Sequence, residues 1–222
     1  MRICCAADLH GHLPKIPECD LLLLGGDLTP GWARDPLDGR DWLDTEFRAW
    51  LEALPARTQV VGVAGNHDFV FQEDAATFDA PLRWTYLQDS GTTCGGLSIW
   101  GTPWQPTFFD WAFNLEEEEL AEKWALIPEG IDVLLLHGPP YGHGDPTPRG
   151  PVGSPSLLRR IEAVRPRLAV AGHLHSGYGI HPIGPTTLAS CSLLDEEYEP
   201  ANRPIVVDFT DAGIVVVDCG PR

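Results

Sequence analysis

The sequence is poor in basic residues. Lys and Arg together number 15 against 32 Asp and Glu, so the formal net charge is -17. A negative surplus of this size disfavours binding to the anionic backbone of a nucleic acid, and we expect no bulk nucleic-acid binding. It does not exclude a small phosphorylated molecule, because two bound divalent cations would make the field inside a site positive even in an acidic protein.

The chain also lacks paired cysteines and long apolar runs. Its six cysteines form no C-x-x-C pair and no recurring spacing, which disfavours a zinc ribbon or a disulfide framework and favours a reducing compartment. The longest apolar stretches are the length of a strand, whereas a membrane span needs about 20 consecutive apolar residues. Residues 1–8 contain a short apolar strand that ends at Asp8, and they lack the apolar core and cleavage site of a signal peptide. We therefore expect a cytoplasmic location and no membrane association.

Short apolar runs recur along the chain, separated by helical patterns or loops, and this alternation predicts an α/β sheet protein. Because the runs are apolar throughout rather than at alternate positions, we expect their strands to be covered on both faces. A chain of 222 residues can bury one good core, and we predict a single domain over residues 1–222. The five runs are Arg2 to Ala7, Asp20 to Leu24, Gln59 to Ala64, Ile131 to Leu136 and Leu168 to Ala171.

Helix signals lie between these runs. An amphipathic pattern ends at Pro55, and Ser154-Pro155 is typical of an N-cap followed by a proline in the first turn. The acidic run 116–119 is interpreted as the solvated first turn of a helix, where carboxylates meet the positive end of the dipole. Helices are predicted over residues 41–54, from an Asn114 cap to Trp124, and from Ser154 to Val164, and antiparallel strands over residues 186–189, 204–209 and 214–217.

A residue of a metal-ligand type stands immediately after each of the five apolar runs. One alone would more often be a cap or a satisfied polar group. Five together indicate a shared site, because residues beyond the carboxyl ends of parallel strands converge on one crevice. Neighbouring glycines permit the sharp turns that such a site needs. The blocks are Asp8-Leu9-His10, Gly25-Gly26-Asp27, Gly65-Asn66-His67-Asp68, His137-Gly138 and Gly172-His173-Leu174-His175.

The types of ligand restrict the metal. Carboxylates, imidazoles and an amide carbonyl, without a thiolate, suit manganese, iron or zinc in five- or six-coordinate geometry rather than a closed structural zinc site. Seven candidate side chains are too many for one ion, so we predict two metal ions that share Asp27. The predicted sets are Asp8, His10, Asp27 and His175 for one ion, and Asp27, Asn66, His137 and His173 for the other.

Two adjacent metal ions favour in-line displacement at phosphorus, with hydroxide as the nucleophile. The leaving alkoxide needs a proton, and His67 is placed beside a predicted ligand to supply it. Asp68 could orient the imidazole of His67 and raise its pKa. The alternatives for His67 are a further metal ligand or a hydrogen-bonded core histidine.

The order D-x-H, G-D, G-N-H-D, H-G, G-H-x-H resembles the five-block signature of the calcineurin-like metallophosphoesterase superfamily. This resemblance implies a four-layer αββα sandwich of two mixed β-sheets flanked by helices, and the metal and general-acid roles given above match the pattern. Further segments extend the resemblance to the metallophosphoesterase-domain-containing branch, which is similar to class III cyclic nucleotide phosphodiesterases. They are Tyr86 to Ser90, Gly101 to Pro106, Phe113 to Leu115, Ile127 to Asp132, His137 to Pro140, Gly177 to Gly179 and Pro204 to Val206.

That branch implies a phosphodiesterase that hydrolyses small substrates, cyclic nucleotides among them, with manganese favoured over iron or zinc. Some members lack the first histidine of the last block and are poor catalysts, whereas this chain keeps His173, which favours activity. Many superfamily members carry an arginine shortly after the G-D block, but Leu28-Thr29-Pro30 supplies none. Phosphate binding would then depend on the metals and His67, which weakens the case for a preference for monoesters.

Two residues outside the blocks are candidates for substrate contact. Trp104 lies between two prolines in an aromatic segment, and an aromatic wall with few polar groups is typical of a ligand pocket, although core packing is the simpler account. His143 lies in the Pro-Gly loop that follows the fourth block. A phosphomonoesterase or a nuclease-like enzyme is an alternative function, and a nucleotide-binding scaffold with a non-catalytic metal site is an alternative of another class.

Overall fold

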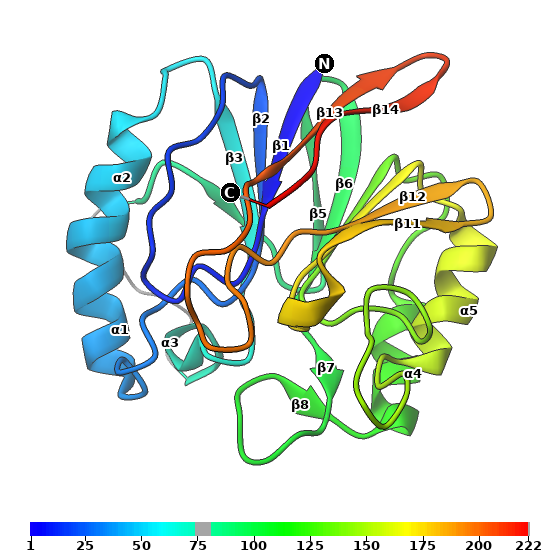
Figure 1. Ribbon diagram of the computed structural model, residues 1–222, viewed down its shortest axis with the longest axis horizontal. Helices are drawn as coiled ribbons and strands as arrows, with labels where there is room; N and C mark the ends of the chain where they lie inside the picture. Colours follow the sequence, from blue (N-terminus) through cyan, green and yellow to red (C-terminus); the bar gives the residue numbers. More distant parts are fainter. Residues whose placement is uncertain (74–80, 222) are drawn as a thin grey trace.

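A computed structural model describes residues 1–73 and 81–221 of the chain. Two six-stranded sheets face each other in the middle of the molecule, with helices α1 (Pro36–Trp42) and α2 (Arg48–Ala53) outside one sheet and α4 (Glu117–Ala125) and α5 (Pro155–Val164) outside the other (Figure 1). The predicted α/β class and the four-layer arrangement are confirmed. The extent of the domain stays a prediction.

The first sheet contains three of the predicted buried strands at its centre. Strands β1, β2, β3 and β4 run parallel to one another, while β13 pairs with β1 in the antiparallel direction and β14 pairs with β13. The order is β14-β13-β1-β2-β3-β4. The strands are β1 (Arg2–Ala6), β2 (Leu21–Gly25), β3 (Gln59–Val63), β4 (Thr85–Tyr86), β13 (Ile205–Thr210) and β14 (Gly213–Asp218).

The second sheet has the order β11-β12-β10-β9-β6-β5. Its inner strands are parallel, and the edge strands β5 and β11 are antiparallel to their neighbours. The strand predicted at residues 186–189 is β12, which is antiparallel to β11 but parallel to β10. The prediction that the C-terminal strands are all antiparallel is therefore wrong. The strands are β5 (Ser90–Cys94), β6 (Leu97–Thr102), β9 (Val133–Leu136), β10 (Leu168–Ala171), β11 (Gly179–Ile183) and β12 (Thr186–Ser190).

Continuous apolarity in the strands follows from this layering. In β1, Cys4 and Ala6 belong to the core under the helices on one side, while Ile3 and Cys5 pack into the core between the two sheets. All four side chains are fully buried. A strand with both faces covered needs apolar residues at every position, as predicted.

The three predicted helices are present, but the one predicted over residues 41–54 begins at Pro36 and is interrupted by a π-helical turn, and the short helix over residues 69–73 was not predicted. Ser154 caps α5 by accepting a hydrogen bond from the backbone N–H of Leu157, as predicted. The predicted cap Asn114 is wrong: Asn114 belongs to the short strand β8 (Asn114–Leu115), which pairs with β7 (Gln105–Pro106), and Glu116 caps α4 in a capping box with Glu119. The remaining helical segments are η1 (Leu43–Phe47), a π-helical turn, α3 (Phe69–Glu73) and η2 (His175–Gly177).

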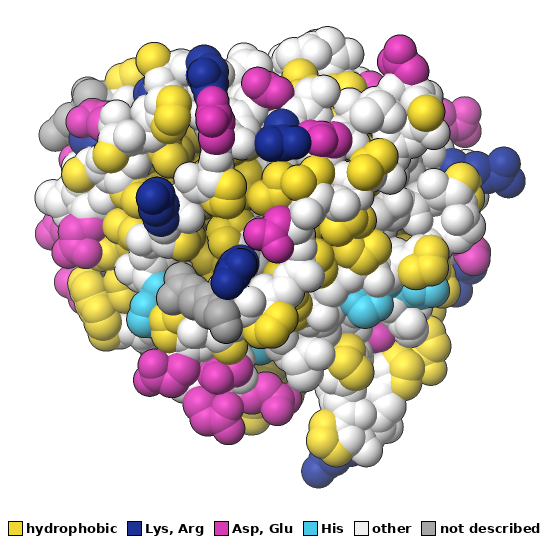
Figure 2. All heavy atoms as spheres, turned by 45° about the horizontal axis from the view of Figure 1, so that its top comes forward, with side chains coloured by type: hydrophobic (Ala, Val, Ile, Leu, Met, Phe, Trp, Pro, Cys, Tyr) yellow, Lys and Arg dark blue, Asp and Glu magenta, His cyan; other side chains and the backbone are white. Residues whose placement is uncertain are grey.

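The surface reflects the acidic composition. Figure 2 shows acidic side chains gathered at the lower left of the face in view, whereas basic side chains are spread singly. All six cysteines are free thiols, and only Cys219 is exposed. Among the residues that the structure describes, no helix is long and apolar enough to cross a membrane.

Candidate metal centre

The five predicted blocks meet at the carboxyl ends of β1, β2, β3, β9 and β10, where the chain leaves both sheets in the lower half of Figure 1. Their side chains form three overlapping groups, in each of which the ligand atoms lie within 4.8 Å of one another. The groups are Asp8 with His10 and His175, His10 with Asp27 and His67, and Asp8 with Asp27 and His137. The structure thus brings together residues from five segments of the sequence.

Asp27 lies between the two predicted ligand sets. One of its carboxylate oxygens, Oδ2, is 3.5 Å from Nε2 of His10, and the other, Oδ1, is 3.5 Å from Nε2 of His137. The backbone N–H of His67 donates to Oδ1 at 2.7 Å, which fixes the orientation of the carboxylate. A carboxylate held with one oxygen toward each set has the geometry of a bridging ligand.

The second set gathers around the amide of Asn66. Its Oδ1 lies 2.8 Å from Nε2 of His137 and 2.8 Å from Nδ1 of His173. The other nitrogen of His137, Nδ1, lies 2.8 Å from the carbonyl oxygen of Gly25 and must donate to it, because a carbonyl can only accept. In a neutral His137, Nε2 then carries a lone pair that faces the amide oxygen of Asn66. Two electron pairs facing each other at this distance are a suitable environment for a cation.

His175 in the first set is oriented in the same way. Its Nδ1 donates to the backbone carbonyl of Asp195 at 2.6 Å, which leaves Nε2 as the nitrogen able to bind a metal. His10 provides a further sign, because neither of its buried ring nitrogens has a hydrogen-bond partner among the described residues. Buried polar atoms are normally paired, so these nitrogens fit a metal ion as their partner.

The electrostatics of the site agree with this fit. Burial, followed by the neighbouring charges of Asp68 and Asp8, raises the pKa of Asp27 well above its ordinary value. Burial and the neighbouring histidines lower the pKa of His10 well below its ordinary value, so this imidazole stays neutral near pH 7. Buried carboxylates in need of compensating charge and neutral imidazoles together form a donor set that suits two divalent cations.

The backbone at these blocks is bent into conformations that most residues avoid. Asp8, His10, Asp27 and His173 all have positive φ, between 42° and 69°. Such conformations cost free energy and persist where the surrounding structure imposes them, often at functional sites. A Cβ on Gly172 would lie 2.5 Å from Cβ of Ala7, so only glycine permits the last block to approach β1 so closely. These strained backbone conformations direct the side chains of several blocks toward one point.

Asp68 does not have the role expected from the sequence. Its buried carboxylate accepts hydrogen bonds at 2.8 to 3.1 Å from the backbone N–H groups of Leu28, Thr29 and Gly65, and from the hydroxyl of Thr29. Nδ1 of His67 has no hydrogen-bond partner among the described residues. The expectation that Asp68 orients His67 is therefore wrong, because the carboxylate is already occupied in joining the loops after β2 and β3.

The pKa of His67 also differs from the expectation. Burial, the neighbouring histidines His137 and His175, and the cationic Arg34 lower it to about 4, whereas a contact with Asp68 was expected to raise it. The ring of His67 is held instead by Trp111, which stacks on it with 4.1 Å between centroids and 30° between planes. The guanidinium of Arg34 lies 4.4 Å from the ring of Trp111. The aromatic character of the segment around Trp104 was visible in the sequence, but no motif singled out Trp111 or Arg34.

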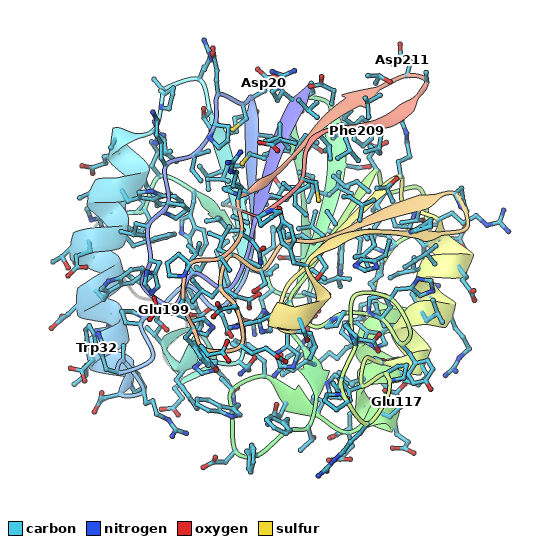
Figure 3. All side chains as sticks on the ribbon, viewed as in Figure 1. Asp20, Trp32, Glu117, Glu199, Phe209 and Asp211 are labelled. Carbon is cyan, nitrogen blue, oxygen red and sulfur yellow. The ribbon has the colours of Figure 1, made fainter. Side chains whose placement is uncertain are left out.

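A third residue that the sequence did not reveal is Tyr198, in the connection between β12 and β13. Its ring lies edge-on to His10 and His175, with centroids 4.9 and 5.0 Å away. Figure 3 places the neighbouring Glu199 in the lower half of the molecule, on the side of the site and away from Asp20 and Asp211. The carbonyl that orients His175 comes from the same turn, at Asp195. A lone tyrosine among acidic residues carries no motif that could have predicted this position.

The cluster forms the floor of a cavity of about 510 Å³. Above the floor stand apolar and aromatic side chains from the loops after β7 and β12 and from the loop before α5. The lining residues are His10, Asp27, Asn66, His67, His173, His175, Pro106, Thr107, Phe108, Phe109, Trp111, Thr147, Val152, Leu174 and Tyr198.

The two residues proposed from the sequence for substrate contact are not among these lining residues. The indole Nε1 of Trp104 donates to the carboxylate of Asp89 at 3.0 Å, and the ammonium of Lys123 lies 4.2 Å from its ring, so Trp104 belongs to a structural cluster beside α4. His143 is half-buried in a turn in which its backbone N–H donates to the carbonyl of Pro140 at 3.2 Å. The structure gives neither residue a place in the cavity.

Comparison with known proteins agrees with the site. A family model described as calcineurin-like phosphoesterase matches residues 1–177. The human metallophosphoesterase domain-containing protein 1 is 36% identical, covering 94% of this chain and 71% of its own length, and the mouse protein of that name matches equally. A UPF0046 protein of Caenorhabditis elegans is 32% identical over 94% of this chain and 60% of its own.

Solved structures show the same fold at low sequence identity. One superposes with a TM-score of 0.70 at 16% identity and covers 99% of each chain. The structure of TT1561 of Thermus thermophilus superposes with a TM-score of 0.62 at 15% identity and covers 98% of each chain. With the motif blocks gathered at one site and the family model matched over most of the sequence, the chain belongs to the calcineurin-like phosphoesterases and is a metal-dependent phosphoesterase.

Proposed function

We propose that the chain hydrolyses small phosphodiesters, with nucleotides and cyclic nucleotides as candidate substrates, and that manganese is the metal it uses. The observation that carries this proposal is the carboxylate of Asp27, which presents one oxygen to His10 and the other to His137 at 3.5 Å each. Asp8, His10 and His175 would complete one cation site, and Asn66, His137 and His173 the other. Two divalent cations, when bound, supply Lewis acidity and lower the pKa of a water to make a nucleophile.

The lining of the cavity supports a diester rather than a monoester. None of the described residues that line it is Lys or Arg. A monoester dianion would be bound more tightly by such cationic side chains. A diester carries only one negative charge and needs room for a second substituent. The space beside the floor, within about 510 Å³, can hold that substituent. The net charge of -17 supports a small substrate over a polynucleotide.

His67 has the position of a general acid. It lines the cavity beside Asp27, and its ring is held in place by Trp111. The imidazole would give a proton to the leaving oxygen once the phosphate anion is bound, because a nearby anion favours the imidazolium form and opposes the effect of burial on the pKa. A further ligand role for His67 stays open, since its ring also belongs to a group with His10 and Asp27.

The test is a comparison of bis(p-nitrophenyl) phosphate with p-nitrophenyl phosphate, each with manganese, iron and zinc. We expect a higher kcat/KM for the diester with manganese, and a loss of about 100-fold or more in a folded His67→Gln variant. A higher kcat/KM for the monoester would indicate a phosphomonoesterase. Tight binding of a nucleotide without turnover under every metal would indicate the scaffold function instead.

A further inference from the structure

Two exposed phenylalanines stand at the rim of the cavity without a packing role. Phe108 and Phe109 lie in the connection between β7 and β8, with 60% and 73% of their surface exposed. Their rings meet edge to face, with centroids 4.4 Å apart. A contiguous exposed apolar patch, unlike scattered single side chains, often marks a site of interaction.

The backbone beneath these rings is fixed. The side-chain amide of Asn114 donates to the carbonyl oxygens of Phe108 and Phe109 at 3.0 Å each, and the backbone N–H of Thr107 donates to the carbonyl of Leu115 at 3.2 Å. The connection is thus tied to the strand that follows it. A loop tied in this way holds its two rings in place before any ligand arrives, which lowers the entropy cost of binding.

The two rings line the same cavity as the metal-ligand residues. Trp111, which stacks on His67, lines this cavity as well, together with Tyr198 and Val152. The walls therefore combine aromatic faces with few hydrogen-bonding groups, while the polar atoms are concentrated on the floor. A ligand that matches both parts has an anionic phosphoryl group joined to a flat apolar group.

We propose that Phe108 and Phe109 form a subsite for a planar ring attached to the phosphoryl group, such as the aryl group or nucleobase of a phosphodiester. This inference rests on the proposed function, because it places the phosphoryl group on the metal floor. Phenylalanine offers a ring face and no hydrogen bonds, so the subsite accepts rings without reading their edges. An alkyl chain binds less tightly at this subsite, because it cannot stack on the phenyl rings.

The test measures binding alone, so it does not depend on turnover. Dissociation constants of methylphosphonate, n-hexylphosphonate and phenylphosphonate are measured by titration calorimetry on the manganese-loaded protein, on Phe108→Ala, on Phe109→Ala and on the double variant. The ratio between two phosphonates cancels the shared contribution of the phosphonate group. Leu126→Ala is the matched control, because Leu126 is 52% exposed and does not line the cavity.

We expect phenylphosphonate to bind about tenfold more tightly than methylphosphonate, with n-hexylphosphonate in between. The ratio falls to about one in the double variant and is unchanged in Leu126→Ala. A ratio near one in the parent protein, an unchanged ratio in the double variant, or no binding of any phosphonate overturns the inference. Equal affinity for the hexyl and phenyl compounds overturns the planar specificity.

The two proposals fail in different ways. Hydrolysis of diesters without ring selectivity would leave the proposed function intact and remove the subsite. Ring selectivity that depends on both phenylalanines, without hydrolysis of any ester, would support the subsite and contradict the enzyme. Melting temperatures equal to that of the parent exclude misfolding as the cause, since both rings are exposed and contribute little to the core.

Discussion

His67 and Asp68 are neighbours in the sequence, but their side chains serve different parts of the molecule. The carboxylate of Asp68 is saturated by donors from the loops after β2 and β3, and the imidazole of His67 lies against Trp111 at the cavity. Adjacent side chains in an extended or turning segment point to different sides, so nearness along the chain does not imply contact. We therefore expect Asp68 to contribute to stability and Trp111 to position His67.

Replacing Asp68 with asparagine should therefore destabilise the protein. The variant loses the negative charge and sets an NH2 group among backbone N–H donors, which should cost about 1–3 kcal/mol in the free energy of unfolding. Urea denaturation measures this loss, with the exposed Asp211→Asn variant as the control. A fall in kcat with unchanged stability would show instead that Asp68 acts on His67.

Trp111 offers the complementary test. In Trp111→Leu the ring of His67 loses its stacking partner, and we expect kcat to fall about tenfold with a smaller change in KM, because positioning matters most in the transition state. Trp111→Phe, which keeps a flat ring, should recover much of the loss. Equal effects of the two substitutions on kcat would contradict a positioning role.

The low pKa of His67 predicts a dependence of stability on pH in the metal-free protein. The folded pKa of about 4 lies below the ordinary 6.5, so the unfolded chain binds the proton first as the pH falls. The stability contributed by the neutral imidazole is present above pH 6.5 and is lost toward pH 4, by about 2 kcal/mol between pH 8 and pH 5.

Urea denaturation with a chelator, compared between the parent and His67→Gln, isolates this group. The difference in unfolding free energy between the two proteins should move in favour of the variant as the pH falls from 8 to 5. Titrating groups that do not interact with His67 are common to both proteins and cancel. A difference that does not change with pH would show that His67 titrates normally in the folded state.

Individual ligands could be predicted from the sequence because each one follows an apolar run at the carboxyl end of a strand. The structure brings all seven candidates to one place, although their binding of metal stays a prediction. Trp111, Arg34 and Tyr198 could not be found in the same way. Their contacts depend on how the loops after β2, β7 and β12 fold over the site, and no local pattern in those loops specifies this.

At the scale of elements, α4 and α5 are joined at their first turns. The carboxylate of Glu117 accepts hydrogen bonds from the hydroxyl of Ser154 and from the backbone N–H of Ser156, and the indole of Trp124 donates to the Ser154 hydroxyl at 3.0 Å. Glu117 therefore has a specific partner, whereas the acidic run 116–119 was interpreted as a solvated turn. Figure 3 shows Glu117 at the lower right of the molecule, on the helical layer that covers the second sheet.

Ser154→Ala removes the cap of α5 and the centre of this junction. We expect a loss of about 1–3 kcal/mol in the free energy of unfolding, since an N-cap contributes about 1 kcal/mol and a buried indole N–H loses its partner. Ser154→Thr keeps the hydroxyl and should lose less. Chemical denaturation measures both, and kcat/KM should stay near the parental value because the junction does not line the cavity.

Strands buried on both faces were predicted, whereas the edge strands β4, β5 and β11 were not, and the edge strand β14 was predicted over residues 214–217. β1, β2, β3, β9 and β10 are apolar apart from the exposed first residues of β1 and β3, Arg2 and Gln59. In contrast, β5 consists of Ser90-Gly91-Thr92-Thr93-Cys94, of which only Cys94 is buried. An edge strand is defined by its pairing rather than by apolar side chains. The direction of β12 relative to β10 likewise depends on the second sheet as a whole.

The two sheets together bring the carboxyl ends of their parallel strands to one site. Asp8, Asp27 and Asn66 follow strands of the first sheet, while His137 and His173 follow strands of the second. The core between the sheets therefore positions the metal centre, because any shift between the layers would separate the two groups of ligands. This explains how a protein with a net charge of -17 can build a site for an anionic phosphate around buried cations.

If the carboxylate of Asp27 is shared by two metal ions, the number of ions bound per chain depends on it. Purified protein is loaded with manganese, freed of excess metal by gel filtration and analysed by mass spectrometry for metal per chain, beside an Asp27→Asn variant of equal circular dichroism. We predict two ions per chain in the parent and fewer than two in the variant. One ion or none in the parent, or two in both proteins, would contradict the account.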